Sequence, residues 1–266
     1  MGLGWRRIEM ALGALALVVG VGVLVIAAGG FFAGTPAAAP SAVHVQPATT
    51  TTTVPTADVV PASTVVATTH GAIPGSPAPG APPDRTVPGS WFGYPSVLPV
   101  ISTAPGWLDV RLAQRPNGTT TWVRASDVTL GSTPYDIVVN LATMRLDVFD
   151  AGAPILDFPA GIGAPDQPTP AGDYFVTMQY PPPGPGYGPF VLVTSDHSDA
   201  ITDWENSGDA IIAIHGPIDA HDDALIGTTG AAISHGCIRL HDADLARLSM
   251  IPAGTPIQVV GSPALP

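Results

Sequence analysis

The N-terminal 85 residues lack the pattern of a globular core, which confines any compact fold to the rest of the chain. Residues 10–34 contain no charged side chain and are rich in Leu, Val, Ala and Gly. A secretory hydrophobic region has about 7–15 residues and a membrane-spanning helix about 20, so this length favours an uncleaved anchor. Arg6 and Arg7 precede it. The positive-inside rule therefore predicts a single-pass signal anchor at residues 1–34, with the chain after Phe32 outside the cytoplasm. Cleavage near residues 36–39, giving a secreted protein, is the alternative.

Residues 35–85 are predicted to be a linker. Pro, Ala and Thr dominate this stretch, which includes a run of threonines at 49–53 and carries only Asp58, Asp84 and Arg85 as formal charges. A segment with so few large apolar side chains cannot bury enough surface to offset its conformational entropy. Glycosylation of its threonines remains open.

Residues 86–132 have the composition of a small β module. Trp91, Phe92, Tyr94, Trp107 and Trp122 are concentrated here. Two strand-like runs, 107–112 and 120–124, flank an Asn-Gly pair at 117–118, which is a strong hairpin signal. The pattern is similar to that of bacterial SH3-like domains. We expect its aromatic side chains to form a core rather than a ligand platform, because so small a module must bury its few large residues.

Residues 133–262 form the predicted main domain, and they also have β character. Alternating apolar and polar positions or short apolar runs predict strands at residues 136–141, 145–150, 154–159, 174–180, 190–194, 211–214 and 255–260. One short helix is expected at 243–250, with Asp242 as its N-cap. The Pro- and Gly-rich segment 181–189 is a candidate lid. The fold class is therefore mainly β, with a sandwich or barrel in this domain.

Cys237 is the only cysteine of the chain and lies in the run Ser-His-Gly-Cys-Ile-Arg at 234–239. A thiol with a pKa near ~8.5 is mostly protonated at neutral pH and needs a base to become a nucleophile. A histidine such as His215 can accept that proton, and backbone N–H groups near Gly236 can stabilise an oxyanion. These parts fit covalent acyl transfer.

Two other interpretations of Cys237 are a structural cysteine and a metal ligand. A buried structural cysteine is common, but the polar, glycine-containing surroundings are poor for an apolar core position. A zinc site could draw on His215, His221, His235, Cys237 and His241, but the spacing His-x-Cys-x-x-x-His is not a usual ligand pattern. Neither a metal nor an organic cofactor is expected.

Around Cys237 the chain resembles the L,D-transpeptidase family with a YkuD-type catalytic domain. The resemblance rests on Ile-His-Gly at 214–216, Leu-Ile-Gly at 225–227 and the run from Ser234 to Leu240. Segments 167–175 and 253–257 resemble the family's "TPxGxF" and "GTPV" motifs. The resemblance covers about residues 134–261. The segment between His215 and Ser234 is slightly longer than usual, and we interpret its acidic surplus, with Asp219 and Asp223, as a loop insertion at the cleft rim.

The resemblance implies a mechanism and a set of site residues. Cys237 would attack the carbonyl preceding a terminal D-Ala of a peptidoglycan stem peptide, giving a thioester that the amine of a second stem resolves as a cross-link. The resemblance implies that His215 is the base and that the Gly216 carbonyl holds its tautomer. His235, Gly236 and Cys237 would line the oxyanion site. Ser234 would support the turn, and Arg239 would support the loop or bind a substrate carboxylate.

The expected partners are peptidoglycan stem peptides, as donor tetrapeptide and acceptor amine, and carbapenem inhibitors. A net charge of −12 argues against nucleic acid. Two other functions stay open. Water as the acceptor would make the protein an L,D-carboxypeptidase, and a cleft blocked by the inserted loop would leave a non-catalytic wall-binding protein.

Overall fold

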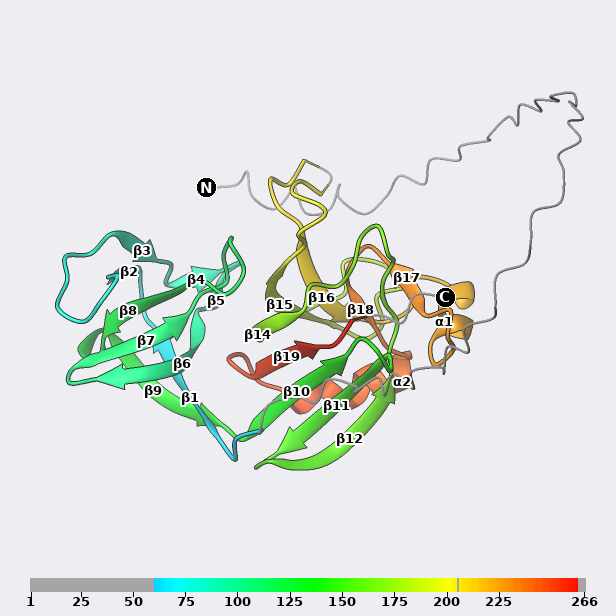
Figure 1. The fold of residues 1–266 in the computed structure, drawn as a ribbon, viewed down its shortest axis with the longest axis horizontal. Coiled ribbons are helices and arrows are strands. Elements are labelled where there is room, and N and C mark those ends of the chain that lie inside the picture. Colours follow the sequence, from blue (N-terminus) through cyan, green and yellow to red (C-terminus); the bar gives the residue numbers. More distant parts are fainter. Residues whose placement is uncertain (1–59, 205, 263–266) are drawn as a thin grey trace, which may run out of the picture. The chain divides into compact units, whose positions relative to one another are not determined.

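The computed structural model describes residues 60–204 and 206–262 (Figure 1). The predicted signal anchor and the first part of the predicted linker lie outside these residues. Within the described ranges, no helix is both long and apolar enough to cross a membrane.

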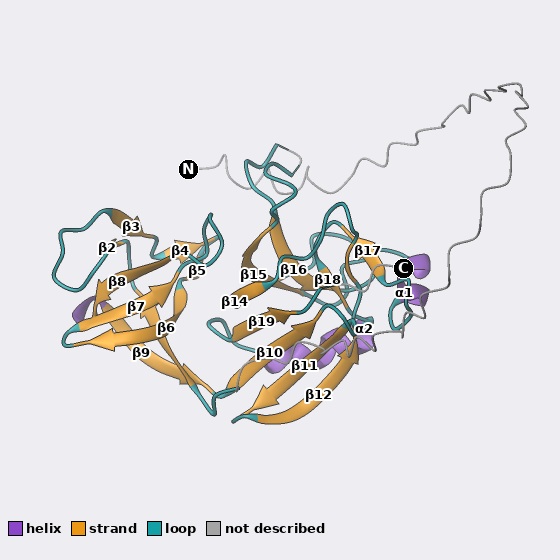
Figure 2. Ribbon diagram, viewed as in Figure 1, coloured by secondary structure: helices purple, strands orange, loops and turns teal. Residues whose placement is uncertain are grey.

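Strands dominate the described residues, with few helices (Figure 2). The mainly β fold class is thereby confirmed. The strands are β1 Thr64–Thr69, β2 Ile73–Gly75, β3 Arg85–Val87, β4 Ser90–Trp91, β5 Tyr94–Pro95, β6 Val97–Ala104, β7 Trp107–Arg111, β8 Thr120–Arg124, β9 Val128–Thr133, β10 Tyr135–Asn140, β11 Arg145–Asp150, β12 Ala153–Pro159, β13 Ile162–Gly163, β14 Gly172–Tyr180, β15 Val191–His197, β16 Ile211–His215, β17 Ala232–Ser234, β18 Ile238–Arg239 and β19 Pro256–Val260. The helices are α1 Ala220–Leu225 and α2 Asp242–Ala246, with 3-10 turns at Ala125–Asp127 and Arg247–Met250.

The N-terminal part forms a five-stranded sheet in the order β8-β7-β6-β1-β9. The β7–β8 hairpin has the predicted position, with Trp107 opposite Arg124 and Arg111 opposite Thr120. The core of this sheet contains Ala67, Leu98, Leu108, Val110 and Val123, among others. The expectation that the aromatic side chains of residues 86–132 form this core is wrong, because none of them belongs to it. The SH3-like assignment of this sheet stays a prediction.

The predicted linker does not extend to Arg85 in the structure. β1 pairs with both β6 and β9 inside the N-terminal sheet, and β2 pairs with β3. Val66 and Ala67 of β1 are buried. β-branched Thr and Val favour strands even where large apolar side chains are scarce, because packing against neighbouring strands supplies the burial.

The main domain contains an eight-stranded sheet in the order β12-β11-β10-β19-β14-β15-β16-β18, curled into a half-barrel. β10 and β19 pair in parallel, although one opens the domain and the other closes it. The core packs Leu146, Val176, Leu192 and Ile214 against Leu245 of α2. The expected sandwich or barrel is therefore a single curled sheet with one helical cover.

β14 contributes to two cores. Tyr174 and Val176 pack in the core of the main domain, whereas Phe175 packs with the N-terminal sheet. Successive strand residues point to opposite faces, so one strand serves both cores. A hydrogen bond from Arg111 Nη1 to the Asp173 carbonyl oxygen, at 2.8 Å, adds a polar contact between the same two parts.

Two helical predictions need correction. The described residues contain two α-helices rather than one, because the acidic segment expected to be a loop contains α1. Asp219 caps this helix, since its side chain accepts hydrogen bonds from the N–H groups of His221 and Asp222, both at 2.9 Å. In the second helix, Asp242 is the first helical residue and His241 is the N-cap, one position earlier than predicted.

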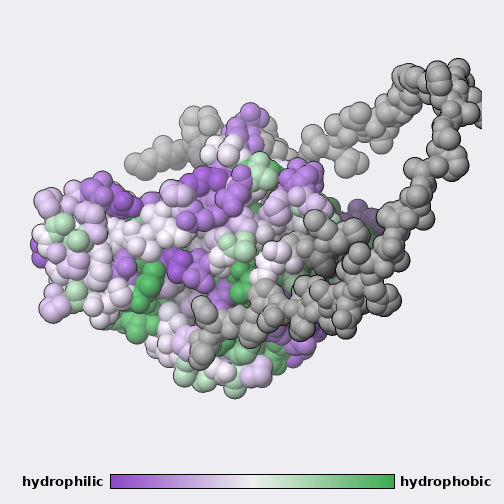
Figure 3. Space-filling view, viewed as in Figure 1, coloured by the Kyte–Doolittle hydropathy of each residue, from purple (hydrophilic) through white to green (hydrophobic). Residues whose placement is uncertain are grey.

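On the face drawn in Figure 3, hydrophobic surface appears as separate patches among polar surface. Among the large exposed residues are Val65 in β1 and Phe92 between β4 and β5. Phe92 is 53% exposed and lies beside the cavity described next.

Candidate active site

Two adjacent parallel strands bring the motif residues together. In the β16–β18 pairing, Ile214 lies opposite Ile238 and His215 opposite Arg239. Cys237 directly precedes β18 and Gly216 directly follows β16. Residues far apart in sequence therefore meet at one edge of the half-barrel.

The turn that carries Cys237 is fixed by two hydroxyl groups. Ser234 Oγ donates to the Cys237 carbonyl at 2.5 Å and accepts from the Gly236 N–H at 3.1 Å. Thr169 Oγ1 donates to the Gly236 carbonyl at 2.7 Å and accepts from the Gly163 N–H at 2.9 Å. Ser234 and Thr169 are both buried, so they act as internal supports of the turn.

Gly236 is required by geometry. Its φ is 118°, and a Cβ at this position would lie 2.6 Å from Cδ1 of Ile212. The Gly236 N–H donates to Ser234 Oγ, so Gly236 helps to shape the turn. The oxyanion role expected of Gly236 stays a prediction.

His215 is oriented as a base. The ring is buried, at 3% exposure, and its Nδ1 lies 2.6 Å from the Gly216 carbonyl oxygen, the contact expected from the sequence. A carbonyl only accepts, so Nδ1 carries the proton and Nε2 has the free lone pair. Burial, followed by the charge of Arg239, lowers the pKa of His215 to about 4. The imidazole is therefore neutral at pH 7. The ring of Tyr187, in the candidate lid segment, lies 4.8 Å from it.

Cys237 is half-buried and is a free thiol. Burial raises its pKa, while a hydrogen bond with the Ala213 backbone and the charge of Arg239 oppose that rise. With His215 neutral as well, the resting site holds a thiol and an imidazole rather than a thiolate–imidazolium pair. Nucleophilic attack would then require proton transfer at the moment of reaction.

Arg239 is engaged by the helix that the sequence analysis missed. Its Nη1 contacts Asp222 Oδ2 of α1, and both side chains are largely buried, at 8% and 14% exposure. Nearby, His241 Nδ1 lies 2.6 Å from Asp223 Oδ1. The acidic segment therefore supplies the counter-charge of Arg239, which favours the structural role over binding of a substrate carboxylate.

A cavity of about 540 Å³ connects these groups. His215, His235, Cys237 and Arg239 line it, whereas Ser234 and Gly236 lie in the supporting turn. Its other walls are largely aromatic or apolar and come from several segments: Trp91, Phe92, Tyr180, Tyr187, Ile201 and Trp204.

His235 is exposed at the rim of the cavity, and the Trp204 ring lies 4.9 Å from its ring. Sequence reasoning missed Trp204, Asp222 and Thr169 as site residues. Trp204 could have been noticed as a large aromatic residue in an otherwise polar stretch, and Thr169 lies in a segment already matched to the family. No local signal pointed to the pairing of Asp222 with Arg239.

Within the described residues, no group of three or more His, Cys, Asp or Glu side chains is arranged to hold a metal ion.

The fold and this constellation define a cavity lined by a cysteine and a histidine at one edge of a half-barrel sheet, and one segment of the chain matches a known family. Residues 134–259 match the model of the YkuD L,D-transpeptidase catalytic domain. The resemblance expected from the sequence is confirmed for this part of the chain.

The individual relatives are distant. A curated putative L,D-transpeptidase YkuD from Bacillus licheniformis is 26% identical over 127 residues, which is 47% of this chain and 66% of that protein. Among solved structures, an L,D-transpeptidase from Mycobacterium smegmatis is 20% identical with a TM-score of 0.38, covering 62% of this chain and 82% of its own. The structure of LD transpeptidase LdtMt1 in complex with imipenem is 18% identical with a TM-score of 0.36, covering 74% and 82%. The match thus spans just under two thirds of the curated relative's length.

Proposed function

We propose that this protein is a peptidoglycan L,D-transpeptidase. The observation that carries the proposal is the placement of His215 at the end of β16 and of Cys237 directly before the neighbouring β18, both lining one cavity, inside the segment that matches the L,D-transpeptidase catalytic domain. The substrates are the donor tetrapeptide stem and the amine of a second stem.

In the first half-reaction, Cys237 Sγ attacks the carbonyl carbon preceding the terminal D-Ala. Nε2 of His215 accepts the thiol proton, which its lone pair allows because Nδ1 is committed to the Gly216 carbonyl. The peptide C–N bond then breaks, the departing D-Ala amine takes the proton from His215, and a thioester remains on Cys237.

In the second half-reaction, the acceptor amine attacks the thioester carbonyl and loses a proton to His215. The C–S bond breaks and the proton returns to Cys237, so the enzyme is regenerated with no redox change. Water in place of the amine gives L,D-carboxypeptidase activity by the same steps.

Mass spectrometry of disaccharide-tetrapeptides incubated with the protein tests the proposal. A cross-linked dimer with release of D-Ala is the expected product, whereas a shortened monomer would identify the carboxypeptidase. Unchanged substrate with a folded protein would contradict both and favour a non-catalytic wall-binding protein.

The nucleophile is tested with a carbapenem. We expect one covalent adduct on the protein, and Cys237→Ala should abolish both the adduct and D-Ala release. Because Cys237 is the only cysteine, a Cys237→Ala protein that still forms the adduct would disprove the thiol mechanism.

A further inference from the structure

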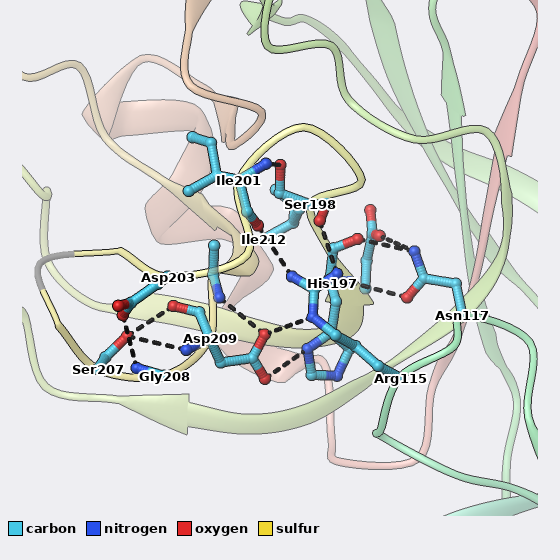
Figure 4. A network of polar contacts seen from close by, with 12 residues as sticks. Arg115, Asn117, His197, Ser198, Ile201, Asp203, Ser207, Gly208, Asp209 and Ile212 are labelled. Carbon is cyan, nitrogen blue, oxygen red and sulfur yellow. Dashed lines mark hydrogen bonds and ion pairs between the residues drawn. The ribbon is translucent and has the colours of Figure 1, made fainter.

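Residues at the tip of the β7–β8 hairpin, in the N-terminal sheet, form hydrogen bonds with a segment of the main domain (Figure 4). Arg115 donates three hydrogen bonds: from Nε to Asp209 Oδ1 at 2.9 Å, from Nη1 to the Ser198 carbonyl at 2.8 Å, and from Nη2 to the Ile201 carbonyl at 2.9 Å. One guanidinium therefore joins the beginning and the end of the connection from β15 to β16, of which the structure describes residues 198–204 and 206–209.

Asn117, two residues further along the hairpin, forms a second set of hydrogen bonds with the main domain. Its Oδ1 accepts from the His197 N–H at 3.0 Å, and its Nδ2 donates to the His197 carbonyl at 2.7 Å. Both hydrogen bonds are made with one backbone unit at the end of β15 (Figure 4). The base of the segment is thereby fixed.

Asp209 is the most connected residue of this network. Its Oδ1 also accepts from the Ala210 N–H at 2.7 Å, and its Oδ2 lies 2.8 Å from His197 Nδ1, close enough for an ion pair although outside hydrogen-bond angles. Burial acts to raise the pKa of Asp209, but the close contact with His197 and the hydrogen bonds from Ala210 and Arg115 outweigh it and lower the pKa. The carboxylate is therefore charged and available to Arg115 at neutral pH.

The segment that Arg115 contacts forms one wall of the active-site cavity. Ile201, Trp204 and Asp209 line that cavity together with Cys237. The Trp204 N–H donates to the Asp209 carbonyl at 2.9 Å, and the Trp204 ring lies against His235. A path of direct contacts thus runs from Arg115 through Asp209 and Trp204 to His235, which is two residues before Cys237 in the sequence.

We propose that Arg115 is a positioning residue through which the N-terminal sheet sets the cavity wall formed by residues 198–204 and 206–209, and with it the access of a stem peptide to Cys237. The identification of the substrate as a stem peptide rests on the proposed function, whereas the control of access to the Cys237 thiol does not. The guanidinium suits this task because its rigid fork of donors engages a carboxylate and two carbonyls at once, which a lysine ammonium does not reproduce.

The reactivity of Cys237 measures this positioning without any substrate. In the full-length protein, Arg115→Ala should speed labelling by a bulky aromatic disulfide reagent by roughly fivefold or more, on the scale of contact-mediated coupling. Labelling by iodoacetamide, which is small, should change less than about twofold, since loosening one wall affects large reagents more than small ones. Equal changes with the two reagents would overturn the proposal.

Arg111→Ala is the matched control. Arg111 lies in the same hairpin and also reaches the main domain, but at Asp173 in β14 rather than at the cavity wall. Its loss should leave the labelling ratio of the two reagents unchanged. If Arg111→Ala and Arg115→Ala have the same effect, the hairpin acts through general stability and the proposal fails.

A double-mutant cycle tests whether Arg115 acts through Trp204. Trp204→Ala should reproduce the labelling change, and Arg115→Ala should add little to it; full additivity would contradict the path. Arg115→Lys covers the case in which the alanine variant does not fold, and it should show an intermediate labelling ratio. A wild-type ratio in a folded Arg115→Lys protein would show that the fork is not needed.

Turnover of the donor tetrapeptide tests whether the positioning role of Arg115 also affects the proposed reaction. Arg115→Ala should lower kcat/KM for the tetrapeptide by roughly tenfold, mainly through KM, because the wall binds substrate without touching the reacting atoms. A lowered kcat with an unchanged KM would count against a positioning role. If no variant or wild-type protein turns over the tetrapeptide while the labelling ratios behave as expected, the proposed function fails and the positioning role stands.

Discussion

His215 and Cys237 form a neutral pair in the resting site, and this has a measurable signature in pH. With the pKa of His215 at about 4, the base stays unprotonated well below neutrality. Carbapenem acylation should therefore change little between about pH 7 and 5 and decline only near pH 4. An acid limb near pH 6.5 would show that the working base is a solvated histidine instead. Circular dichroism at each pH checks that the fold persists.

That check matters because burial of neutral His215 also affects stability. The folded pKa lies below the unfolded value of 6.5, so the unfolded chain binds the proton more readily. The contribution of this group to stability is intact above about pH 6.5 and is lost as the pH falls toward 4.

Substitution separates His215 from the other histidines. His215→Gln should lower the acylation rate by roughly 10² or more, the usual scale for loss of general base catalysis. His221→Ala should have little effect, because His221 is exposed on α1. Equal losses would mean that the base has been assigned to the wrong histidine.

At the scale of elements, the contact of α1 with β18 is expected to be essential. Asp222→Asn removes the charge that compensates Arg239, and leaving one partner of a largely buried pair alone costs about 3 kcal/mol. Asp223→Asn is the control. Its contact with His241 is more exposed, at 35% and 49%, so its loss should cost less than about 1 kcal/mol. Urea unfolding of both variants measures the difference; equal destabilisation would contradict the special role of Asp222.

Besides His215, Asp196 near the end of β15 makes the stability of the protein depend on pH. Burial, followed by the charge of Asp199, raises the pKa of Asp196 to about 8. Because the folded pKa exceeds the unfolded value of 3.8, this group favours the folded state least at high pH, and stability is lost as the pH rises from about 4 to 8.

Asp196→Asn should remove that loss. The asparagine keeps an acceptor for Asn117 Nδ2, which lies 3.1 Å from Asp196 Oδ1. We expect the variant to gain stability relative to the wild type between pH 4 and pH 8, as measured by urea unfolding at both values. A constant difference at the two values would show that the pKa of Asp196 is not raised in the folded protein.

The sequence was most informative where a local pattern carries the physical cause. The Asn-Gly pair at 117–118 predicted the β7–β8 hairpin, and the alternation in 145–150 gave β11 with its exact bounds. β1 was missed because its residues 64–69 are only Thr, Val and Ala in a Pro-rich context, and its burial comes from strands 97–104 and 128–133.

The site shows the same division. Cys237 and His215 could be found from their motif, because a thiol, a base and a glycine turn are adjacent in sequence or in a short pattern. The pairing of Arg239 with Asp222 and the contact between the Trp204 and His235 rings could not, since both depend on where separate segments meet in space. The occupied N–H of Gly236 likewise became evident only from the hydrogen bond to Ser234.

For the whole molecule, the N-terminal segment determines where the enzyme would work. We propose a single-pass anchor at residues 1–34, with the described domains on the outer side of the membrane. The full-length protein should then stay in the membrane fraction through a high-salt wash, because burial of apolar side chains is insensitive to ionic strength. Recovery of a soluble form beginning near Pro40 would instead identify a cleaved signal peptide.

Deletion of residues 1–34 gives the complementary test. The truncated protein should be soluble and should keep its carbapenem reactivity, because the cavity is built from residues 91–239. Loss of reactivity in a folded truncated protein would show that the N-terminal segment contributes to the site.

The strand order of the main domain also has a consequence for synthesis. β19 is the last strand to leave the ribosome, yet it lies between β10 and β14 and pairs with both. Until residues 256–260 emerge, β10 and β14 each lack a neighbour, and an unpaired strand edge does not close a sheet. The eight-stranded sheet thus lacks one of its interior strands until residues 256–260 have been synthesised.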